Sequence, residues 1–182
     1  DNTDALDRLQ IQYGTSFGYP ISAVGSHVSA VPNHQTGRIT SLHTRGVVAM
    51  AGTFGYELNL GKLSEEEKEE IRSQVEEYRK FAPLIQTGLY YRLSDPSKEE
   101  YAAWAFVSED QKEVLLNVVM QEIHGNMTVN YVNLQGLKCS AVYRDTETGK
   151  TYNGAALMEA GIPMPVEMGE FKAYQMHLTA EE

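Results

Sequence analysis

Apolar residues recur at helical spacing from the start of the chain. Four of them stand three or four positions apart: Leu6, Leu9, Tyr13 and Phe17. This period predicts a helix from Asp1 to about Tyr13. The pattern ends at Gly14, Gly18 and Pro20, which are residue types that commonly terminate helices.

The next stretch alternates between strand-like and helix-compatible segments. Residues 24–32 are rich in β-branched and small residues, which predicts a short buried strand, and the polar residues 33–38 predict a loop. Residues 44–52 are small and compatible with a helix, and residues 53–58 again have the composition of a strand. This order indicates a parallel α/β unit, and such units close into barrels.

The clearest helix is predicted from Ser64 to about Ile85. Ser64 and Glu67 have the spacing of a capping box. An apolar stripe follows: Ile71, Val75, Tyr78, Ala82 and Ile85. The pattern predicts a surface helix that covers a core, with the glutamate run as its solvated face. The short heptad-like stretch and the interrupting Pro83 argue against a coiled coil.

Short β-type segments follow Gly88: residues 89–93, 102–107, 114–120, 127–134, 139–143, 151–152 and 171–178. Strands at this spacing, without intervening helices, predict an antiparallel sandwich. Five aromatic residues lie at the start of this half: Tyr90, Tyr91, Tyr101, Trp104 and Phe106. They could stack on sugars, but their alternation along strands favours core or interdomain contacts.

Composition narrows the classes of partner. The 182 residues suit one domain or two small ones. A formal charge of -10 argues against general binding to nucleic acid or to anionic membranes, and no apolar run is long enough to cross a bilayer. The single cysteine, Cys139, excludes an internal disulfide and suits a reducing compartment, so we expect a cytoplasmic location.

Three carboxylates stand at the start of the first predicted helix: Asp1, Asp4 and Asp7. In a structural interpretation, Asn2 or Thr3 caps the helix, and the acids sit against the positive end of its dipole. In a chemical interpretation, Asp1 projects from the end of a preceding strand into a pocket and exchanges protons with a substrate. Composition alone favours the structural interpretation.

Two other patterns invite a catalytic or metal interpretation. Residues 14–18, Gly-Thr-Ser-Phe-Gly, match the G-x-S-x-G elbow of serine hydrolases, but that turn needs a strand before it and a helix after it. We therefore interpret this stretch as a helix exit. His27, His34 and His43 are close in sequence, yet no nearby carboxylate completes a metal site, so we expect them to order loops by hydrogen bonds.

Two blocks in the first half are long enough to indicate a family. Residues 1–14 read Asp-Asn-Thr-Asp-Ala-Leu-Asp-Arg-Leu-Gln-Ile-Gln-Tyr-Gly, and residues 25–38 read Gly-Ser-His-Val-Ser-Ala-Val-Pro-Asn-His-Gln-Thr-Gly-Arg. Thr44-Arg45-Gly46 and residues 54–58, Phe-Gly-Tyr-Glu-Leu, continue the match. These blocks resemble the microbial retaining α-galactosidases of glycoside hydrolase family 36. The resemblance continues more weakly to the carboxyl end.

The resemblance implies a catalytic role for the first residue. In the family, the acid/base aspartate lies in a Ser-Asp-Asn motif, and Asp1 is the residue that matches it. The implied reaction is retaining hydrolysis of terminal α-galactosides such as melibiose or raffinose, with Asp1 as proton donor and then general base. No cofactor and no metal are implied. Asp4 is the alternative candidate, but we expect it to stabilise the helix start, and we expect Asp7 and Arg8 to pair on the helix surface.

The family's nucleophile lies in a Lys-Trp-Asp motif that this sequence lacks. The only tryptophan, Trp104, is followed by Ala105. The chain therefore looks like a piece of a longer polypeptide whose upstream part carries the nucleophile, and we expect the isolated chain to be inactive.

The resemblance also implies a fold and partners. Residues 1–88 would be the C-terminal part of a catalytic (β/α)8 (TIM) barrel, and residues 89–182 a C-terminal antiparallel β-sandwich domain, so the fold class is α/β plus all-β. The partners would be an α-galactoside, the remainder of the same enzyme (an N-terminal β-domain and the rest of the barrel) and further copies in a homotetramer.

Other functions stay open at this stage. The more acidic second half suits a non-catalytic carbohydrate-binding or assembly module. Within the enzymes, a galactosyl transferase of the raffinose-synthase type and an α-N-acetylgalactosaminidase are related alternatives.

Overall fold

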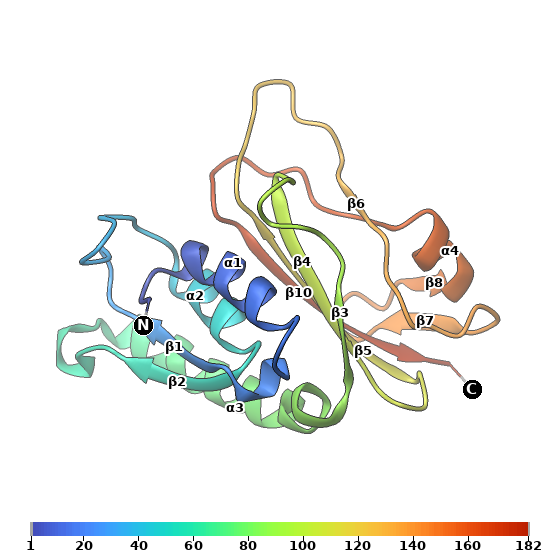
Figure 1. Cartoon of the computed structure of the whole chain (residues 1–182), viewed down its shortest axis with the longest axis horizontal. Coiled ribbons are helices and arrows are strands. Elements are labelled where there is room, and N and C mark those ends of the chain that lie inside the picture. Colours follow the sequence, from blue (N-terminus) through green and yellow to red (C-terminus); the bar gives the residue numbers. More distant parts are fainter. Residues whose placement is uncertain (1, 182) are drawn as a thin grey trace. The chain divides into compact units, whose positions relative to one another are not determined.

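Helices and parallel strands alternate in the first of the two compact units into which the chain divides, residues 1–86 and 87–182. The structure is a computed structural model that describes residues 2–181 (Figure 1). The N-terminal unit contains the following main elements: α1 (Ala5–Thr15), β1 (Gly25–Ser29), α2 (Leu42–Ala49), β2 (Thr53–Glu57) and α3 (Glu65–Thr87). The predicted strand, helix, strand and helix after residue 24 are thus confirmed.

The two strands of the N-terminal unit pair in parallel. Gly25 lies opposite Thr53 and Ser29 opposite Glu57. Side chains on one face of this pair form a small core with α2 and α3: Val28, Leu42 and Ala49, with Phe54, Tyr56, Leu58 and Ile71 packed against them. The other face carries the alternate residues, because successive side chains of a strand point to opposite sides. His27 and Glu57 belong to that second face.

Helix α1 begins at a different cap from the one expected. Asp4 is the N-cap, and its side chain accepts hydrogen bonds from the Leu6 and Asp7 amides. Asn2, which we expected as a possible cap, instead accepts a hydrogen bond from the Asp4 amide at 2.8 Å. The expectation that Asn2 or Thr3 caps the helix was therefore wrong, because an acid stands at the capping position itself. The helix ends at Thr15, which confirms that residues 14–18 are a helix exit.

Helix α3 starts as predicted, and its buried face is wider than the predicted stripe. The Ser64 amide donates to Glu67 Oε2 at 2.8 Å and the Glu67 amide donates to Ser64 Oγ at 3.2 Å, which confirms the capping box. Of the predicted stripe, Ile85 is buried, Ile71 packs against the core and the Tyr78 hydroxyl donates to Gly52 O at 3.2 Å. The helix also buries Gln74, Phe81 and Leu84. Gln74 lies outside the predicted stripe because it is polar; its amide donates to Leu42 O at 3.0 Å and accepts from Tyr56 Oη at 2.8 Å.

The C-terminal unit is organised around an antiparallel sheet of six strands in the order β3-β4-β5-β10-β7-β8 (Figure 1). The strands have these bounds: β3 Leu89–Arg92, β4 Tyr101–Val107, β5 Glu113–Met120, β7 Val142–Asp145, β8 Thr151–Asn153 and β10 Ala173–Ala180. Strands β4 and β5 are almost entirely buried, which explains their continuous runs of apolar residues.

The layer that covers one face of this sheet is smaller than a sandwich requires. It contains a two-stranded ribbon, β6 (Tyr131–Val132) with β9 (Ile162–Pro163), and the short helix α4 (Gly154–Glu159). Their apolar residues share one core with the sheet: Val132, Leu134, Leu157, Ile162 and Met164 pack with Ala103, Ala105, Leu116, Val118 and Leu178. Antiparallel pairing is confirmed, but a second broad sheet was wrongly expected because residues 127–130 and 139–141 lie outside strands.

The aromatic residues at the start of this unit are structural. Trp104 and Phe106 are buried, and the Tyr90 ring lies 5.4 Å from that of Phe106. Tyr91 and Tyr101 pack against the shared core. The interpretation of these residues as core contacts is therefore confirmed. Separately, none of the helices within residues 2–181 is long and apolar enough to cross a bilayer.

Candidate active site

The candidate active site lies at the start of α1, where the loop after β1 contacts Thr3 and Asp4. Asp1, the predicted acid/base residue, lies outside the described residues. Its neighbour Asn2 and the following Thr3 are described, and both are bound to side chains from elsewhere in the N-terminal unit. The site can therefore be built from the residues that surround the start of α1.

Asp4 is buried, and both oxygens of its carboxylate accept hydrogen bonds. It is 2% exposed. Its carboxylate accepts four hydrogen bonds: from the Leu6 amide at 2.9 Å, from the Asp7 amide at 3.3 Å, from the Thr36 hydroxyl and from the Arg38 guanidinium. Burial acts to raise the pKa of Asp4, but these hydrogen bonds outweigh burial and lower the pKa below its ordinary value. Asp4 therefore stays ionised, which confirms its expected role in stabilising the helix start.

The loop after β1 is tied to the residues next to Asp1. Asn33 Oδ1 accepts from the amides of Gln35 and Thr36 at 2.9 and 3.1 Å, which fixes the turn. Asn33 Nδ2 then donates to Thr3 Oγ1 at 3.0 Å. His34 Nδ1 lies 3.4 Å from the same hydroxyl, so this histidine helps to order the loop as expected. Asn33 and Thr36 were not foreseen, because their partners are about 30 residues away in sequence.

Arg8 does not pair with Asp7, contrary to expectation. Adjacent residues on a helix point in different directions, so the two charges face different partners. Asp7 Oδ1 lies 3.3 Å from Arg38 Nη1. Arg8 is 5% exposed and donates to Asn2 O at 3.1 Å and to Gly25 O at 2.6 Å.

His27 connects Arg8 to β2. Arg8 Nη1 lies 3.3 Å from His27 Nδ1, and His27 Nε2 lies 2.8 Å from Glu57 Oε2. Burial first, and the charge of Arg8 second, lower the pKa of His27, while Glu57 opposes them. A neutral ring that accepts at Nδ1 carries its proton on Nε2, towards Glu57. Within residues 2–181, no three His, Cys, Asp or Glu side chains are placed to hold a metal ion.

Removing the Asp4 carboxylate should destabilise this corner of the fold. We expect Asp4→Ala to lower the free energy of unfolding by about 2–3 kcal/mol at pH 7, because it removes an N-cap and the acceptor of a buried charge-assisted hydrogen bond. Asp7→Ala is the matched control, with an expected loss of less than about 1 kcal/mol, since the Asp7 side chain is 43% exposed. Urea denaturation of the 182-residue chain measures both; equal losses would contradict the role assigned to Asp4.

The stability difference between the parent and Asp4→Ala should depend on pH. The native pKa of Asp4 is lowered, so its charge stabilises the fold above the unfolded pKa of about 3.9. This contribution to the free energy of unfolding is lost as the pH falls through the native pKa. The difference between the parent and Asp4→Ala should therefore shrink when denaturation is repeated at acid pH. A difference that stays constant would show that the charge of Asp4 contributes nothing.

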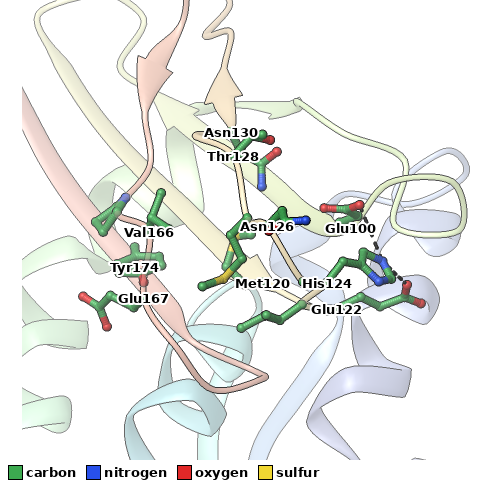
Figure 2. A pocket seen from close by; sticks show the side chains of 14 residues that line it. Glu100, Met120, Glu122, His124, Asn126, Thr128, Asn130, Val166, Glu167 and Tyr174 are labelled. Carbon is green, nitrogen blue, oxygen red and sulfur yellow. Dashed lines mark ion pairs between the residues drawn. The ribbon is translucent and has the colours of Figure 1, made fainter.

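The C-terminal unit carries a separate pocket of about 100 Å³ (Figure 2). His124 lies 3.5 Å from Glu100 and 3.4 Å from Glu122, and Tyr174, Val166 and Glu167 line the opposite side. Burial raises the pKa of Tyr174, and Glu167 adds to the rise. This pocket could not be predicted from the sequence, because the loop after β5 and the segment before β10 come together only in the folded unit.

The pocket is suited to a polar, uncharged or cationic ligand. Carboxylates and the amides of Asn126 and Asn130 can bind hydroxyl groups, while Met120 and Val166 supply apolar contact. None of the described residues that line it is a lysine or an arginine. A sugar is one ligand class with this mixture of hydroxyl groups and apolar faces.

Both units match known protein families. Residues 1–88 match the Melibiase family, and residues 101–178 match the Glycosyl hydrolase family 36 C-terminal domain. The chain is 59% identical to the bifunctional alpha-galactosidase/sucrose kinase AgaSK of Mediterraneibacter gnavus over 98% of this chain and 19% of that protein. It is 47% identical to the alpha-galactosidase AgaA of Geobacillus stearothermophilus over 99% of this chain and 25% of AgaA.

Solved structures of family members superpose on the whole length of this chain. The galactosidase domain of AgaSK superposes with a TM-score of 0.98 at 58% identity, over 100% of this chain and 25% of that one. A variant of AgaA in complex with raffinose superposes with a TM-score of 0.96 at 46% identity, over 100% of this chain and 25% of that one. The chain thus spans about a fifth to a quarter of the length of these relatives.

Proposed function

Because the chain belongs to glycoside hydrolase family 36, we propose that it is part of a retaining α-galactosidase that hydrolyses terminal α-galactosides such as melibiose and raffinose. The observation that carries the proposal is the match of nearly the entire chain to α-galactosidases. The complex of an AgaA variant with raffinose supports the substrate class. No cofactor and no metal take part in the proposed reaction.

We propose that the N-terminal unit supplies the last βα units of a (β/α)8 barrel. In such barrels, catalytic groups lie at the carboxyl ends of the parallel strands. Here the loop that follows the carboxyl end of β1 is bound to Thr3, next to Asp1. Among the described residues β1 pairs only with β2, so its other edge is available to a preceding strand. The C-terminal unit would be the β-domain that follows the barrel.

In the proposed mechanism, Asp1 and an upstream carboxylate share the work. The upstream carboxylate attacks the anomeric carbon while the glycosidic C–O bond breaks and Asp1 gives its proton to the leaving oxygen. Asp1 then takes a proton from water as that water displaces the enzyme carboxylate. Two carboxyl groups in such a pair lie about 5–5.5 Å apart. Asp4 is unsuited to the acid role because its hydrogen bonds keep it ionised.

The stereochemistry of the first product tests this proposal. We expect the full-length enzyme to release α-galactose from melibiose before mutarotation, as two displacements at one carbon require. Proton NMR during the first minutes of hydrolysis would show it. Release of β-galactose would contradict the retaining mechanism, and transfer of galactose to sucrose in place of hydrolysis would favour the raffinose-synthase alternative. Efficient cleavage of N-acetylgalactosaminides would favour the other alternative.

The pocket of the C-terminal unit supports a second candidate function, a carbohydrate-binding module. Titration of the 182-residue chain with galactose tests it: the second candidate predicts saturable binding that Asn126→Ala weakens and that Asn59→Ala, in the N-terminal unit, leaves unchanged. An absence of binding would contradict the module and leave this unit as a structural part of the enzyme.

The assembly and location of the enzyme remain part of the proposal. Family resemblance supports a homotetramer, which light scattering of the full-length enzyme would test. The single, exposed cysteine supports a cytoplasmic location.

A further inference from the structure

Arg8 is a buried charge for which the proposed reaction gives no role. It is 5% exposed, and burial lowers its pKa while the charge of Glu57 opposes this effect. Burying a guanidinium is costly unless its donors are satisfied. Among the described residues, Arg8 contacts two backbone carbonyls and one ring nitrogen: Asn2 O, Gly25 O and His27 Nδ1. Because desolvation of a buried guanidinium costs free energy, surface charge pairing does not explain why Arg8 is buried.

The first of these partners adjoins the candidate acid. Asn2 is the residue bonded to Asp1, and its carbonyl accepts from Arg8 Nη1 at 3.1 Å. Its side chain is fixed as well, because Asn2 Oδ1 accepts from the Asp4 amide at 2.8 Å and Asn2 Nδ2 donates to Asp7 Oδ2 at 3.2 Å. Asn2 is thus held at its carbonyl and at both ends of its side chain.

The other two partners attach Arg8 to β1. Gly25 and His27 belong to a strand whose five residues are paired with β2, so they form a rigid reference. Arg8 Nη2 donates to Gly25 O at 2.6 Å, and Nη1 reaches His27. Nη1 therefore serves both Asn2 and His27, and the planar guanidinium fixes the start of α1 relative to the strand with little rotational freedom.

We propose that Arg8 is a positioning residue for Asp1: by holding the Asn2 carbonyl against β1, it fixes where the Asp1 carboxyl group delivers its proton. This inference rests on the proposed function, in which Asp1 is the acid/base residue. Arg8 touches neither substrate nor reacting atoms in this role. A purely structural Arg8 would slow all substrates alike when replaced, whereas a positioning residue chiefly affects the reactions that depend on proton delivery.

The experiment compares Arg8→Ala, Arg8→Lys and the control Arg72→Ala in the full-length enzyme. Arg72 is an arginine on α3 with a 62% exposed side chain, paired only with Glu69 among the contacts described. For Arg8→Ala we expect kcat/KM on melibiose, which reports the glycosylation step, to fall by about 10- to 100-fold, as misplacement of a catalytic group produces. The kcat/KM of activated aryl galactosides, which need less protonation in that step, should fall far less. Arg72→Ala should match the parent.

Each contrary outcome has a defined meaning. Equal losses of kcat/KM on melibiose and on aryl galactosides in a folded Arg8→Ala enzyme would overturn the positioning role. If Arg8→Ala does not fold, Arg8→Lys decides: a loss confined to melibiose supports the role, and equal losses overturn it. Asp1→Asn is measured in parallel. If Asp1→Asn keeps the parent rate, the proposed function fails; if Asp1→Asn is slow and the Arg8 variants show no substrate dependence, only the inference about Arg8 fails.

Discussion

Asp1→Asn in the full-length enzyme is expected to slow melibiose and raffinose hydrolysis by about 10²- to 10⁴-fold, the usual contribution of a positioned general acid. An amide has the shape of the carboxyl group but cannot donate its proton to the departing sugar oxygen. Nitrophenyl galactosides have leaving groups that depart without much protonation, so they should lose less in the first step. Steady-state kcat/KM on both kinds of substrate measures the difference.

Glu69→Gln is the matched control for this prediction. Glu69 is an acid on α3, with a side chain that is 73% exposed and paired with Arg72. It should keep close to the parent activity on every substrate. If Asp1→Asn also cleaves melibiose at the parent rate, Asp1 is not the acid.

The isolated 182-residue chain is expected to release no galactose from any galactoside. One carboxylate of the pair that a retaining glycosidase needs is proposed to lie upstream, and removing the nucleophile leaves no covalent step. Galactose release by the purified chain is measured against the full-length enzyme at the same molar concentration.

The control for this experiment is the chain with Asp1→Asn. Hydrolysis by the parent chain that disappears in this variant would show that both carboxylates lie within residues 1–182. In that case the nucleophile has been placed wrongly.

Local sequence signals predicted most of the secondary structure. The capping box of α3 follows from Ser64 and Glu67 alone, because its hydrogen bonds join residues three positions apart. Strands β4 and β5 follow from nearly continuous apolar runs, which are typical of buried strands. Strands β1 and β2 follow from short segments with the composition of a strand. These features depend on neighbours in sequence, so the sequence suffices.

The features that could not be predicted are side chains whose partners are distant in sequence. Arg8 was expected to bind its neighbour Asp7, but the fold brings Gly25 and His27 to it. Gln74 was not part of the predicted apolar stripe, yet the fold buries it and supplies hydrogen-bond partners at Leu42 and Tyr56. In each case a polar side chain is buried because tertiary structure satisfies it, and periodicity cannot show that.

The candidate site was predicted in part for the same reason. The resemblance to family 36 predicts the acid/base role of Asp1, which lies outside the described residues, so this role stays a prediction. The role of Asp4 at the helix start is confirmed. The loop residues that bind Asp4 and Thr3 were not foreseen, because they become neighbours only when β1 and α1 pack together. The pocket around His124 depends on two loops that are far apart in sequence.

The most direct test of the proton-donor role is azide rescue of Asp1→Ala on an aryl α-galactoside. Without Asp1, the galactosyl-enzyme forms but water attacks it slowly, whereas azide needs no general base. We predict that azide accelerates turnover and that NMR identifies the product as α-galactosyl azide, since azide displaces the enzyme carboxylate with a second inversion. A β-galactosyl azide would show that Asp1 is itself the nucleophile. If Asp1→Ala turns over at the parent rate and azide has no effect, Asp1 is neither the acid/base residue nor the nucleophile, and the account is contradicted.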